Sequence, residues 1–172
     1  MTILLTGLPC SGKTTISLAL QSLLRASNYR AEILDGDVIR FELWKELGFS
    51  QSDREENVRR LGYLARLLSR NGAIAIIAAV APYRASRDAI RRISDNGFME
   101  IHVDAPLSVC ESRDVKGMYA QARAGKRPHF TGIDDPYELP SNPELYCRTD
   151  QETVAEIVAR IVFQLKKQGA KP

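Results

Sequence analysis

The chain has 172 residues, which is enough for one well-packed domain and little more. Hydrophobic residues make up 44% and charged residues 26%, the balance of a globular protein. The net charge of +3 is too small to indicate a nucleic-acid binder, and no apolar run approaches the ~20 residues that a membrane span needs. We therefore expect neither nucleic acid nor a membrane as a partner.

A buried strand is predicted at the start of the chain, over Thr2–Thr6, because these residues form a short apolar run with β-branched members. No basic region or cleavage site precedes it, so we expect no signal peptide and a cytoplasmic location. A helix follows from about Thr15, where apolar residues recur at helical spacing. Residues 7–14 lie between the two and match the phosphate-binding pattern G-x-x-x-x-G-K-[ST] at every fixed position.

This phosphate-binding loop predicts a polyphosphate site. Successive backbone N–H groups of such a loop surround the phosphates, and the helix N-terminus adds its positive end. Lys13 is expected to reach the β- and γ-phosphates, and the Thr14 hydroxyl is expected to bind Mg²⁺. The alternative is a glycine-rich turn with a chance lysine, and the flanking strand and helix disfavour it.

Two carboxylates follow the second predicted strand, Tyr29–Leu34, at Asp35 and Asp37. The carboxyl ends of strands face the ligand crevice in open α/β sheets, so this position suggests chemistry. The Asp-Gly pair is also a turn signal, and a solvated turn is the alternative. The neighbouring phosphate-binding loop favours a functional role.

A short helix over Val38–Leu47 and a loop over Gly48–Gln51 are predicted next. Ser52 then predicts a helix N-cap, with Glu55 reaching back in a capping box. Arg54 and Asn57 are three residues apart and project from one face of this helix's first turn. They form either a solvated charged face or part of the crevice, and the residues alone leave both open.

The middle of the chain alternates strands and helices. The continuous apolar run Ala73–Val80 predicts a central strand that is buried on both faces, after a helix that ends at Gly72. A basic helix over Arg84–Asn96 and a strand over Phe98–Asp104 follow. Pro106 predicts a further helix from about Leu107.

Residues 116–142 are rich in glycine, proline and basic side chains, and we refer to them as the lid. A long loop without regular structure is uncommon and is often an active-site lid. A basic lid that closes over phosphates and expels water is common in kinases. The alternative is a surface loop without function, but Phe130 and Tyr137 among the glycines and charges favour a lid.

The C-terminal part predicts a short last strand, Tyr146–Thr149, and a final helix. Thr149 is the expected N-cap of this helix, with Glu152 completing a second capping box, and the tail from Lys166 to Pro172 is expected to fray. The alternation of elements predicts an α/β fold with a mainly parallel five-stranded sheet and helices on both faces. We expect a single domain over 1–172, with the basic lid at about 116–142.

With these residues in view, the chain resembles the adenosine-5′-phosphosulfate kinases (adenylylsulfate kinases), which have a P-loop NTPase-type fold. The resemblance covers nearly the whole chain, and in this order its motifs are highly specific. They are the segments 7–15, 35–37 with Arg40, 48–49, 53–60, 82–84, 103–107, 110–114, 116–119, 122–125, 130–134, 136–138 and 143–145.

The resemblance implies transfer of the γ-phosphate of ATP to the 3′-hydroxyl of adenylyl sulfate, with Mg²⁺ bound by Thr14 and Asp35. Lys13, Asp35 and Asp37 are the implied catalytic residues, with Asp37 as base or orienting group for the acceptor hydroxyl. Residues implied to bind ATP are Gly7, Leu8, Pro9, Cys10, Ser11, Gly12, Lys13, Thr14, Thr15 and Arg113, the last near the base. Residues implied to bind the acceptor are Asp37, Arg40, Phe49, Arg54, Asn57, Val80, Lys116 and Phe130.

Within the second set, Arg40, Arg54 and Asn57 are implied to hold the phosphosulfate, since arginine forks fit tetrahedral oxyanions. Phe49 and Phe130 are implied to sandwich the acceptor's adenine, and Lys116 belongs to the closing lid. The resemblance also implies a homodimer.

Four positions depart from the family's pattern. Ala81 replaces a serine to which a phosphoserine intermediate has been assigned, and direct in-line transfer does not need that hydroxyl. Pro128 replaces a lid lysine, for which Lys126 or Arg127 could substitute. Pro9 and Cys10 replace a small pair in the phosphate-binding loop, and proline removes one N–H donor.

Cys10 also suggests a reactive thiol, because Lys13 and a helix N-terminus lie near it; an inert small residue is the alternative. Cys110 and Cys147 complete an odd set without metal-ligand spacing, so disulfides and zinc are not expected.

Two other functions remain open on the sequence. The changes at Ala81 and Pro128 are compatible with a kinase for another nucleotide-linked acceptor that has a free 3′-hydroxyl. A non-catalytic nucleotide-binding module that regulates a partner enzyme is the second, and intact Lys13 and Asp37 argue against it.

Overall fold

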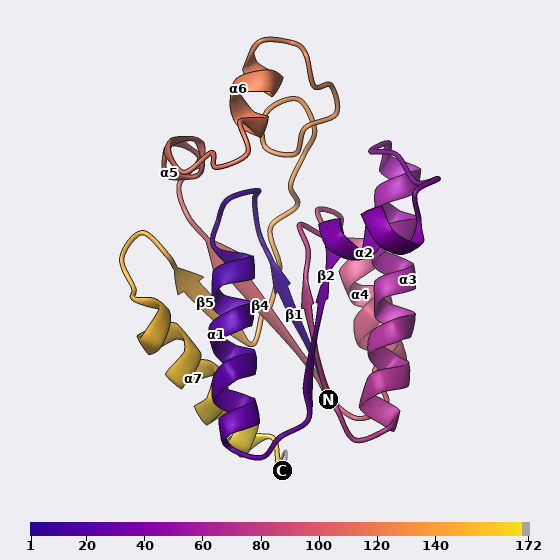
Figure 1. The fold of residues 1–172 in the computed structure, drawn as a ribbon, viewed down its shortest axis with the longest axis vertical. Coiled ribbons are helices and arrows are strands. Elements are labelled where there is room, and N and C mark those ends of the chain that lie inside the picture. Colours follow the sequence, from indigo (N-terminus) through magenta and orange to yellow (C-terminus); the bar gives the residue numbers. More distant parts are fainter. Residues whose placement is uncertain (170–172) are drawn as a thin grey trace.

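The computed structural model describes residues 1–169, and their centre is a parallel sheet (Figure 1). Its five strands lie in the order β2-β3-β1-β4-β5, and every neighbouring pair is parallel. The strands are β1 (Thr2–Thr6), β2 (Ala31–Asp35), β3 (Ile74–Ala78), β4 (Phe98–Asp104) and β5 (Leu145–Arg148). The α/β fold with a five-stranded parallel sheet that the sequence predicts is confirmed.

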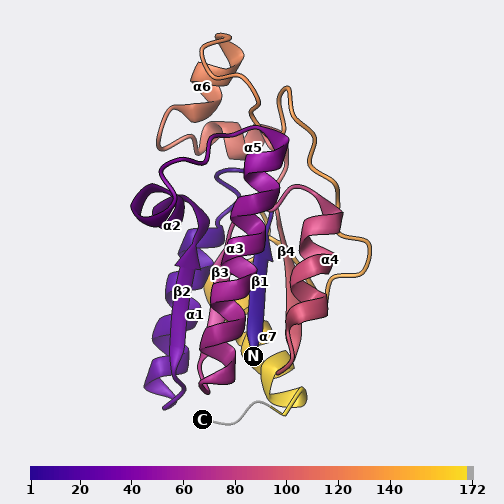
Figure 2. The same cartoon turned by 90° about the vertical axis from the view of Figure 1, so that its right-hand side faces the viewer.

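Helices cover both faces of the sheet, as predicted. The helices α1 (Lys13–Ala26) and α7 (Val154–Lys167) lie on one face, and α3 (Gln51–Arg70) and α4 (Arg84–Ile93) lie on the other (Figures 1 and 2). All the carboxyl ends of the strands consequently meet at one edge, where the connections to the helices begin. In this class of fold that edge is where ligands bind.

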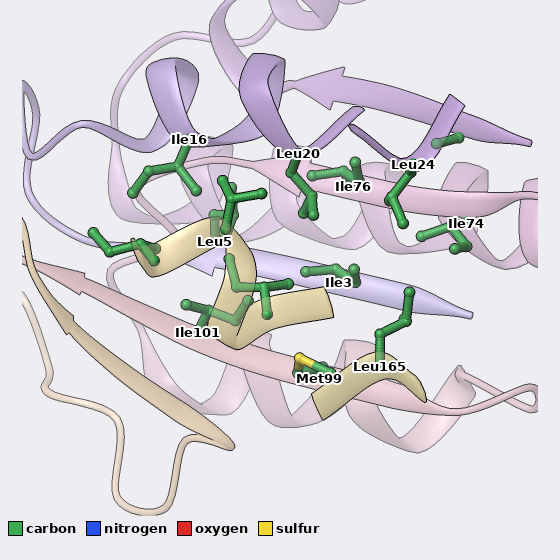
Figure 3. Packing of buried hydrophobic residues seen from close by; sticks show 14 of the residues in the cluster. Ile3, Leu5, Ile16, Leu20, Leu24, Ile74, Ile76, Met99, Ile101 and Leu165 are labelled. Atoms are coloured by element: carbon green, nitrogen blue, oxygen red, sulfur yellow. The ribbon is translucent and has the colours of Figure 1, made fainter. Parts of the chain in front are cut away.

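Each face of the sheet has its own core. Ile3 and Leu5 of β1 pack with Ile16 and Leu20 of α1 and with Leu165 of α7 (Figure 3). Leu4 points to the opposite face and joins the cluster under α3 and α4. Successive side chains of a strand point to opposite faces, so a strand covered on both sides is apolar throughout. This is why the central strands have continuous apolar sequences.

Three shorter helices lie beyond the carboxyl ends of the strands, namely α2 (Gly36–Leu43), α5 (Leu107–Ser112) and α6 (Met118–Arg123) (Figure 1). The lid therefore contains a helix, and the expectation of a stretch without regular structure is wrong there. A third hydrophobic cluster holds it to the body, with Tyr119 and Phe130 of the lid packed beside Cys110 and Leu8. The lid is consequently packed against the phosphate-binding loop.

The structure corrects the predicted start and end of α2. The Asp35 side chain accepts hydrogen bonds from the backbone N–H groups of Asp37 and Val38, at 3.0 and 3.2 Å, and this cap starts the helix at Gly36. The helix ends at Leu43 instead of Leu47. The Asp35 carboxylate thus fixes the local backbone.

Both predicted capping boxes are wrong in position. The N-cap of α3 is Ser50, not Ser52, and its hydroxyl accepts from the Asp53 N–H. The N-cap of α7 is Thr153, not Thr149, and Glu156 completes its capping box. A capping box is recognised in a sequence as a serine or threonine followed three residues later by an acidic residue. Ser50 and Ser52 both fit this pattern, as do Thr149 and Thr153, and packing selected one residue of each pair.

Other boundaries differ by a few residues. Pairing begins at Ala31 in β2, covers Ile74–Ala78 in β3 and runs from Leu145 to Arg148 in β5, and α4 ends at Ile93. Gly72 lies one position after the C-cap of α3, which is Asn71. In the predicted frayed tail, Lys166 and Lys167 belong to α7, and residues 170–172 lie outside the described residues.

Candidate functional site

The phosphate-binding loop is shaped by two glycines. A Cβ on Gly7 would lie 2.1 Å from the carbonyl oxygen of Val103, so only glycine fits this close approach to β4. Gly12 has a φ of +104° and stands at the N-cap of α1 without a side-chain cap. The first N–H groups of α1 therefore stay free to bind an anion.

Lys13 is placed across this loop. Its ammonium donates to the carbonyl oxygens of Gly7 and Leu8, at 3.0 and 2.7 Å. Burial lowers the pKa of Lys13 to about 8, and the carboxylates of Asp37 and Asp35 oppose that shift only in part. A polyphosphate is the charge that would favour the ammonium form at this position.

Thr14 and Asp35 bring two oxygen donors together at the carboxyl ends of β1 and β2. The Thr14 hydroxyl donates to the Asp35 carboxylate at 3.1 Å. Within residues 1–169 no group of three or more His, Cys, Asp or Glu side chains could hold a metal ion. Hard oxygen donors of this small number fit Mg²⁺, which usually takes one or two protein ligands and completes its shell with phosphates and water.

Asp37 lies in the first turn of α2, opposite the lid. Its carboxylate is 3.9 Å from the Lys116 ammonium, and both side chains are about 70% exposed, at 70% and 67%. The pair bridges the two sides of the cavity mouth at the point where the lid leaves the body. A weak, exposed ion pair of this kind opens readily to admit a ligand.

Two arginines converge on the exposed ring of Phe49. The Arg40 and Arg54 guanidinium carbons lie 4.9 and 5.5 Å from the centroid of that ring. Arg54 is almost fully buried and donates to the carbonyl oxygens of Phe49 and His129, the second of which belongs to the lid. The first turn of α3 is therefore part of the crevice, and the solvated-face alternative is wrong for Arg54.

Asn57 lies behind these arginines. It is 4% exposed, and its Oδ1 atom has no hydrogen-bond partner among the described residues. The Nε atom of Arg40 is buried and unpaired in the same way. Unsatisfied buried polar atoms are costly and call for a physical reason, and a polar ligand beside them supplies one.

The lid covers the other side of the crevice with an aromatic pair. Phe130 is 4% exposed and meets Tyr119 edge to face, with ring centroids 4.9 Å apart. Its backbone is held because the Asp134 carboxylate accepts from the N–H groups of His129 and Phe130, at 2.8 and 2.6 Å. The Tyr119 hydroxyl donates to the Pro9 carbonyl oxygen at 3.0 Å, which connects the lid to the phosphate-binding loop.

Most of these groups line one cavity of about 1180 Å³. That is more than a single drug-sized ligand usually occupies, and it suits two nucleotides. The lining includes these residues predicted from the sequence: Pro9, Cys10, Gly12, Lys13, Thr14, Thr15, Asp35, Asp37, Arg40, Phe49, Arg54, Val80, Arg113, Lys116 and Phe130. Four others do not line it, namely Gly7, Leu8, Ser11 and Asn57.

Arg113 lines the cavity and is held there by Thr149, which the sequence predicts to be a helix N-cap. Its guanidinium donates to the Thr149 hydroxyl and carbonyl oxygens, at 2.9 and 2.8 Å, and the Thr149 hydroxyl donates to the Ser11 carbonyl at 2.8 Å. Thr149 thus joins the chain after β5 to the phosphate-binding loop. Nothing in the local sequence distinguishes it from an N-cap, because the contact spans 138 residues.

The departures from the family's pattern have local consequences. Cys10 has a φ of 60°, a left-handed conformation that is costly for a side chain other than glycine. It is half-buried, whereas Cys110 and Cys147 are buried, so it is the accessible thiol of the three. Ala81 is buried, and its carbonyl accepts from Arg87 at 2.7 Å.

Comparison with known proteins places this geometry in a family. The model of the family described as adenylylsulphate kinase matches residues 1–148. Among curated relatives, the adenylyl-sulfate kinase of Rippkaea orientalis is 55% identical, over 100% of this chain and 96% of that protein. The adenylyl-sulfate kinase of Microcystis aeruginosa is 53% identical, over 98% of this chain and 93% of its own length.

The fold is also that of a solved structure. The Mycobacterium tuberculosis APS kinase in complex with AMPPNP and APS superimposes with a TM-score of 0.93 at 39% identity, over 96% of each chain. That protein thus holds an ATP-type nucleotide and an acceptor nucleotide together.

Proposed function

This chain belongs to the adenylylsulphate kinase family, and we propose that it transfers the γ-phosphoryl group of ATP to the 3′-hydroxyl of adenylyl sulfate, giving 3′-phosphoadenylyl sulfate and ADP. One observation carries this proposal. A single cavity is lined both by Lys13 and Thr14 of the phosphate-binding loop and by the arginines that surround Phe49. The enzyme therefore offers a triphosphate site and a second, cationic and aromatic site that face each other.

The donor nucleotide is held by the phosphate-binding loop. Backbone N–H groups of the loop and of the first turn of α1 bind the phosphates, and Lys13 neutralises charge on the β- and γ-phosphates. Pro9 lacks an N–H, so the loop offers one donor fewer. Thr14 and Asp35 would hold Mg²⁺, which when bound adds positive charge at the same phosphates. Arg113, fixed by Thr149, lies beside the base.

The acceptor is held on the opposite side of the cavity. Arg40 and Arg54 bind its phosphosulfate group, while Phe49 and Phe130 hold its adenine. Asn57 does not line the cavity, and its buried, unpartnered Oδ1 atom supports its place in the same anion site. Val80, two residues after the end of β3, lines the same cavity as Asp37. Lys116 and the rest of the lid close the cavity and exclude water, which would otherwise accept the phosphoryl group.

Transfer is in line. The acceptor's 3′-oxygen forms a bond to the γ-phosphorus while the bond from that phosphorus to the β,γ-bridging oxygen breaks, and ADP leaves with the electron pair. Asp37 accepts the proton of the 3′-hydroxyl, or orients it, because its carboxylate lies at the cavity mouth beside Asp35. Ala81 has no hydroxyl, so no phosphoenzyme forms at that position.

The test is an acceptor panel. ADP release is followed by a coupled spectrophotometric assay with ATP, Mg²⁺ and either adenylyl sulfate or other nucleotides that have a free 3′-hydroxyl. We expect turnover with adenylyl sulfate to exceed that with every other acceptor. Turnover with a different nucleotide alone would contradict the proposal, and ATP binding without any turnover would favour a regulatory module.

The proposal extends to location and assembly. We propose that the chain acts as a single kinase domain in the cytoplasm and as a homodimer, and light scattering tests the last point. The structure of residues 1–169 contains no helix long and apolar enough to cross a membrane.

A further inference from the structure

The lid contributes a third cation to the acceptor side of the cavity. The guanidinium carbon of Arg127 lies 5.2 Å from the centroid of the Phe49 ring, to which Arg40 and Arg54 are similarly close, at 4.9 and 5.5 Å. Arg127 also lies 5.7 Å from the centroid of the Phe130 ring. It is half-buried and lines the cavity. Its charge therefore lies inside the site.

The three guanidinium groups differ in their partners. Arg40 donates to the Gly48 carbonyl oxygen, and Arg54 donates to two carbonyl oxygens and lies 3.8 Å from the Asp135 carboxylate. Within residues 1–169, Arg127 makes no hydrogen bond and no ion pair, and the faces of the two phenyl rings are the partners it has. A half-buried cation without an anion is unusual, because its partial loss of hydration is not offset.

The charges around Phe49 also repel one another. Burial lowers the pKa of Arg54, the Asp135 carboxylate opposes this shift, and the Arg127 charge adds to the lowering. Burial likewise lowers the pKa of Arg40, and the Arg54 charge adds to it. An anion bound between these groups would relieve the repulsion, as opposite charges at short distance in a low dielectric attract strongly.

We propose that Arg127 is a substrate-binding residue of the lid, whose guanidinium leaves the two phenyl rings when the acceptor's adenine enters and then binds the acceptor's phosphosulfate group. This rests on the proposed function, because it takes the acceptor to carry both a base and an anion. The exchange is balanced. The adenine takes the ring faces that the cation leaves, and the anion takes the place of the rings as the partner of the cation.

Neighbouring lid cations do not serve the same purpose. Lys126 is exposed and does not line the cavity, and Lys116 lies beside Asp37 instead of the arginines. Lys126 is adjacent to Arg127 and has the same charge, so it provides the matched control.

The experiment measures kcat and KM for adenylyl sulfate, at saturating ATP, in the wild type and in Arg127→Ala, Arg127→Lys and Lys126→Ala. Losing a charged hydrogen bond in Arg127→Ala is expected to raise KM for adenylyl sulfate by about tenfold to a hundredfold, with KM for ATP unchanged. Arg127→Lys should recover part of the loss, and Lys126→Ala should match the wild type. The rise of KM with salt should be shallower in Arg127→Ala, because one ion contact is missing.

Neutral adenosine as a competitive inhibitor separates the anion contact from the fit of the base. Its inhibition constant should not rise in Arg127→Ala, because adenosine has no anion to lose. An equal weakening of adenosine and adenylyl sulfate would show that Arg127 only shapes the aromatic pair. An unchanged or lower KM for adenylyl sulfate would also overturn the proposal, the lower value showing that Arg127 merely blocks the site.

Failure of the proposed function is distinguishable from failure of this inference. The absence of turnover by the wild type with adenylyl sulfate would contradict the function. The role of Arg127 is measured independently of catalysis by titrating adenylyl sulfate into the wild type and Arg127→Ala in a calorimeter. Equal affinities there would overturn the role of Arg127, whatever the turnover. Circular dichroism of each variant verifies that it is folded.

Discussion

Lys13 combines a fixed position with a pKa close to physiological pH. Loss of hydration on burial lowers the pKa of Lys13 to about 8, so the free enzyme loses part of this charge just above neutrality. Bound phosphates favour the ammonium form and raise the pKa of Lys13 in the complex. Binding of ATP and of a proton at Lys13 are therefore coupled.

The coupling predicts how ATP affinity depends on pH. Below pH 8 Lys13 is charged with or without ATP, so affinity is at its highest and level with respect to this group. Above pH 8 Lys13 must take up a proton when ATP binds, so the affinity for ATP should fall by up to about tenfold per pH unit. Titration calorimetry between pH 7 and 9.5 measures this. Lys13→Met should bind weakly at every pH, and an equally steep fall in that variant would contradict the assignment.

Asp37 is predicted to act in transfer and not in ATP binding. It lines the cavity opposite Lys116 of the lid, whereas the phosphate-binding loop and Asp35 are the groups proposed to hold the phosphates and Mg²⁺. Asp37→Ala should lower kcat by about a hundredfold to ten-thousandfold, the range of a lost general base, and leave the Kd of ATP within about twofold. Steady-state kinetics and calorimetry give the two numbers. Wild-type activity in Asp37→Ala would remove Asp37 from the mechanism.

At the scale of elements, two threonines before α7, Thr149 and Thr153, have different contacts. Thr153 caps the helix, accepting from the Glu156 N–H at 3.3 Å while the Glu156 carboxylate accepts from the Thr153 N–H at 2.8 Å. Thr149, four residues earlier, instead connects Ser11 and Arg113. The two residues have the same local pattern and different roles, which can be measured separately.

We predict that substitution of Thr153 affects stability and that substitution of Thr149 affects ATP binding. Thr153→Ala should lower the free energy of unfolding by about 1 kcal/mol, the usual cost of a lost N-cap, and leave ATP affinity unchanged. Thr149→Val should weaken ATP binding, because the phosphate-binding loop and Arg113 lose their common partner. Urea unfolding and ATP titration of both variants test this. Equal loss of ATP affinity in the two would contradict the division of roles.

At the scale of the whole molecule, one buried guanidinium joins segments that are far apart in the sequence. Arg87 of α4 is 1% exposed and lies 2.7 Å from the Glu100 carboxylate of β4. It also donates to the carbonyl oxygens of Ala81, after β3, and Glu138, at the end of the lid, both at 2.7 Å. Two crevice loops, a strand and a helix therefore depend on a single side chain.

Removing that side chain should destabilise the fold as a whole. Arg87→Met leaves Glu100 buried with only the longer 3.3 Å contact to Arg91, and we expect a loss of about 3 kcal/mol of unfolding free energy. For a chain of this size that corresponds to roughly 6–12 °C in Tm, measured by circular dichroism. Arg87→Met/Glu100→Gln should recover part of it, because no unpaired charge remains. A loss below about 0.5 kcal/mol in the single variant would contradict the prediction.

The sequence determined the features that depend on neighbours along the chain. The bounds of β1 and β4 match their predictions, because strands buried on both faces are mainly apolar, and β4 remains recognisable although it contains the buried Glu100 and His102. The phosphate-binding loop was recognisable because its chemistry needs Gly7, Gly12 and Lys13 at fixed spacing. The order of elements was enough to predict a parallel sheet with helices on both faces.

Only the tertiary structure decided which polar groups meet across the crevice. Ser50 and Thr153 became N-caps instead of Ser52 and Thr149, since packing chose between equivalent local patterns. The convergence of Arg54, from α3, and Arg127, from the lid, on one ring likewise has no local signature. Charges far apart in the chain interact through space, so their partners follow from the fold, whereas helices, strands and loops follow from the chain itself.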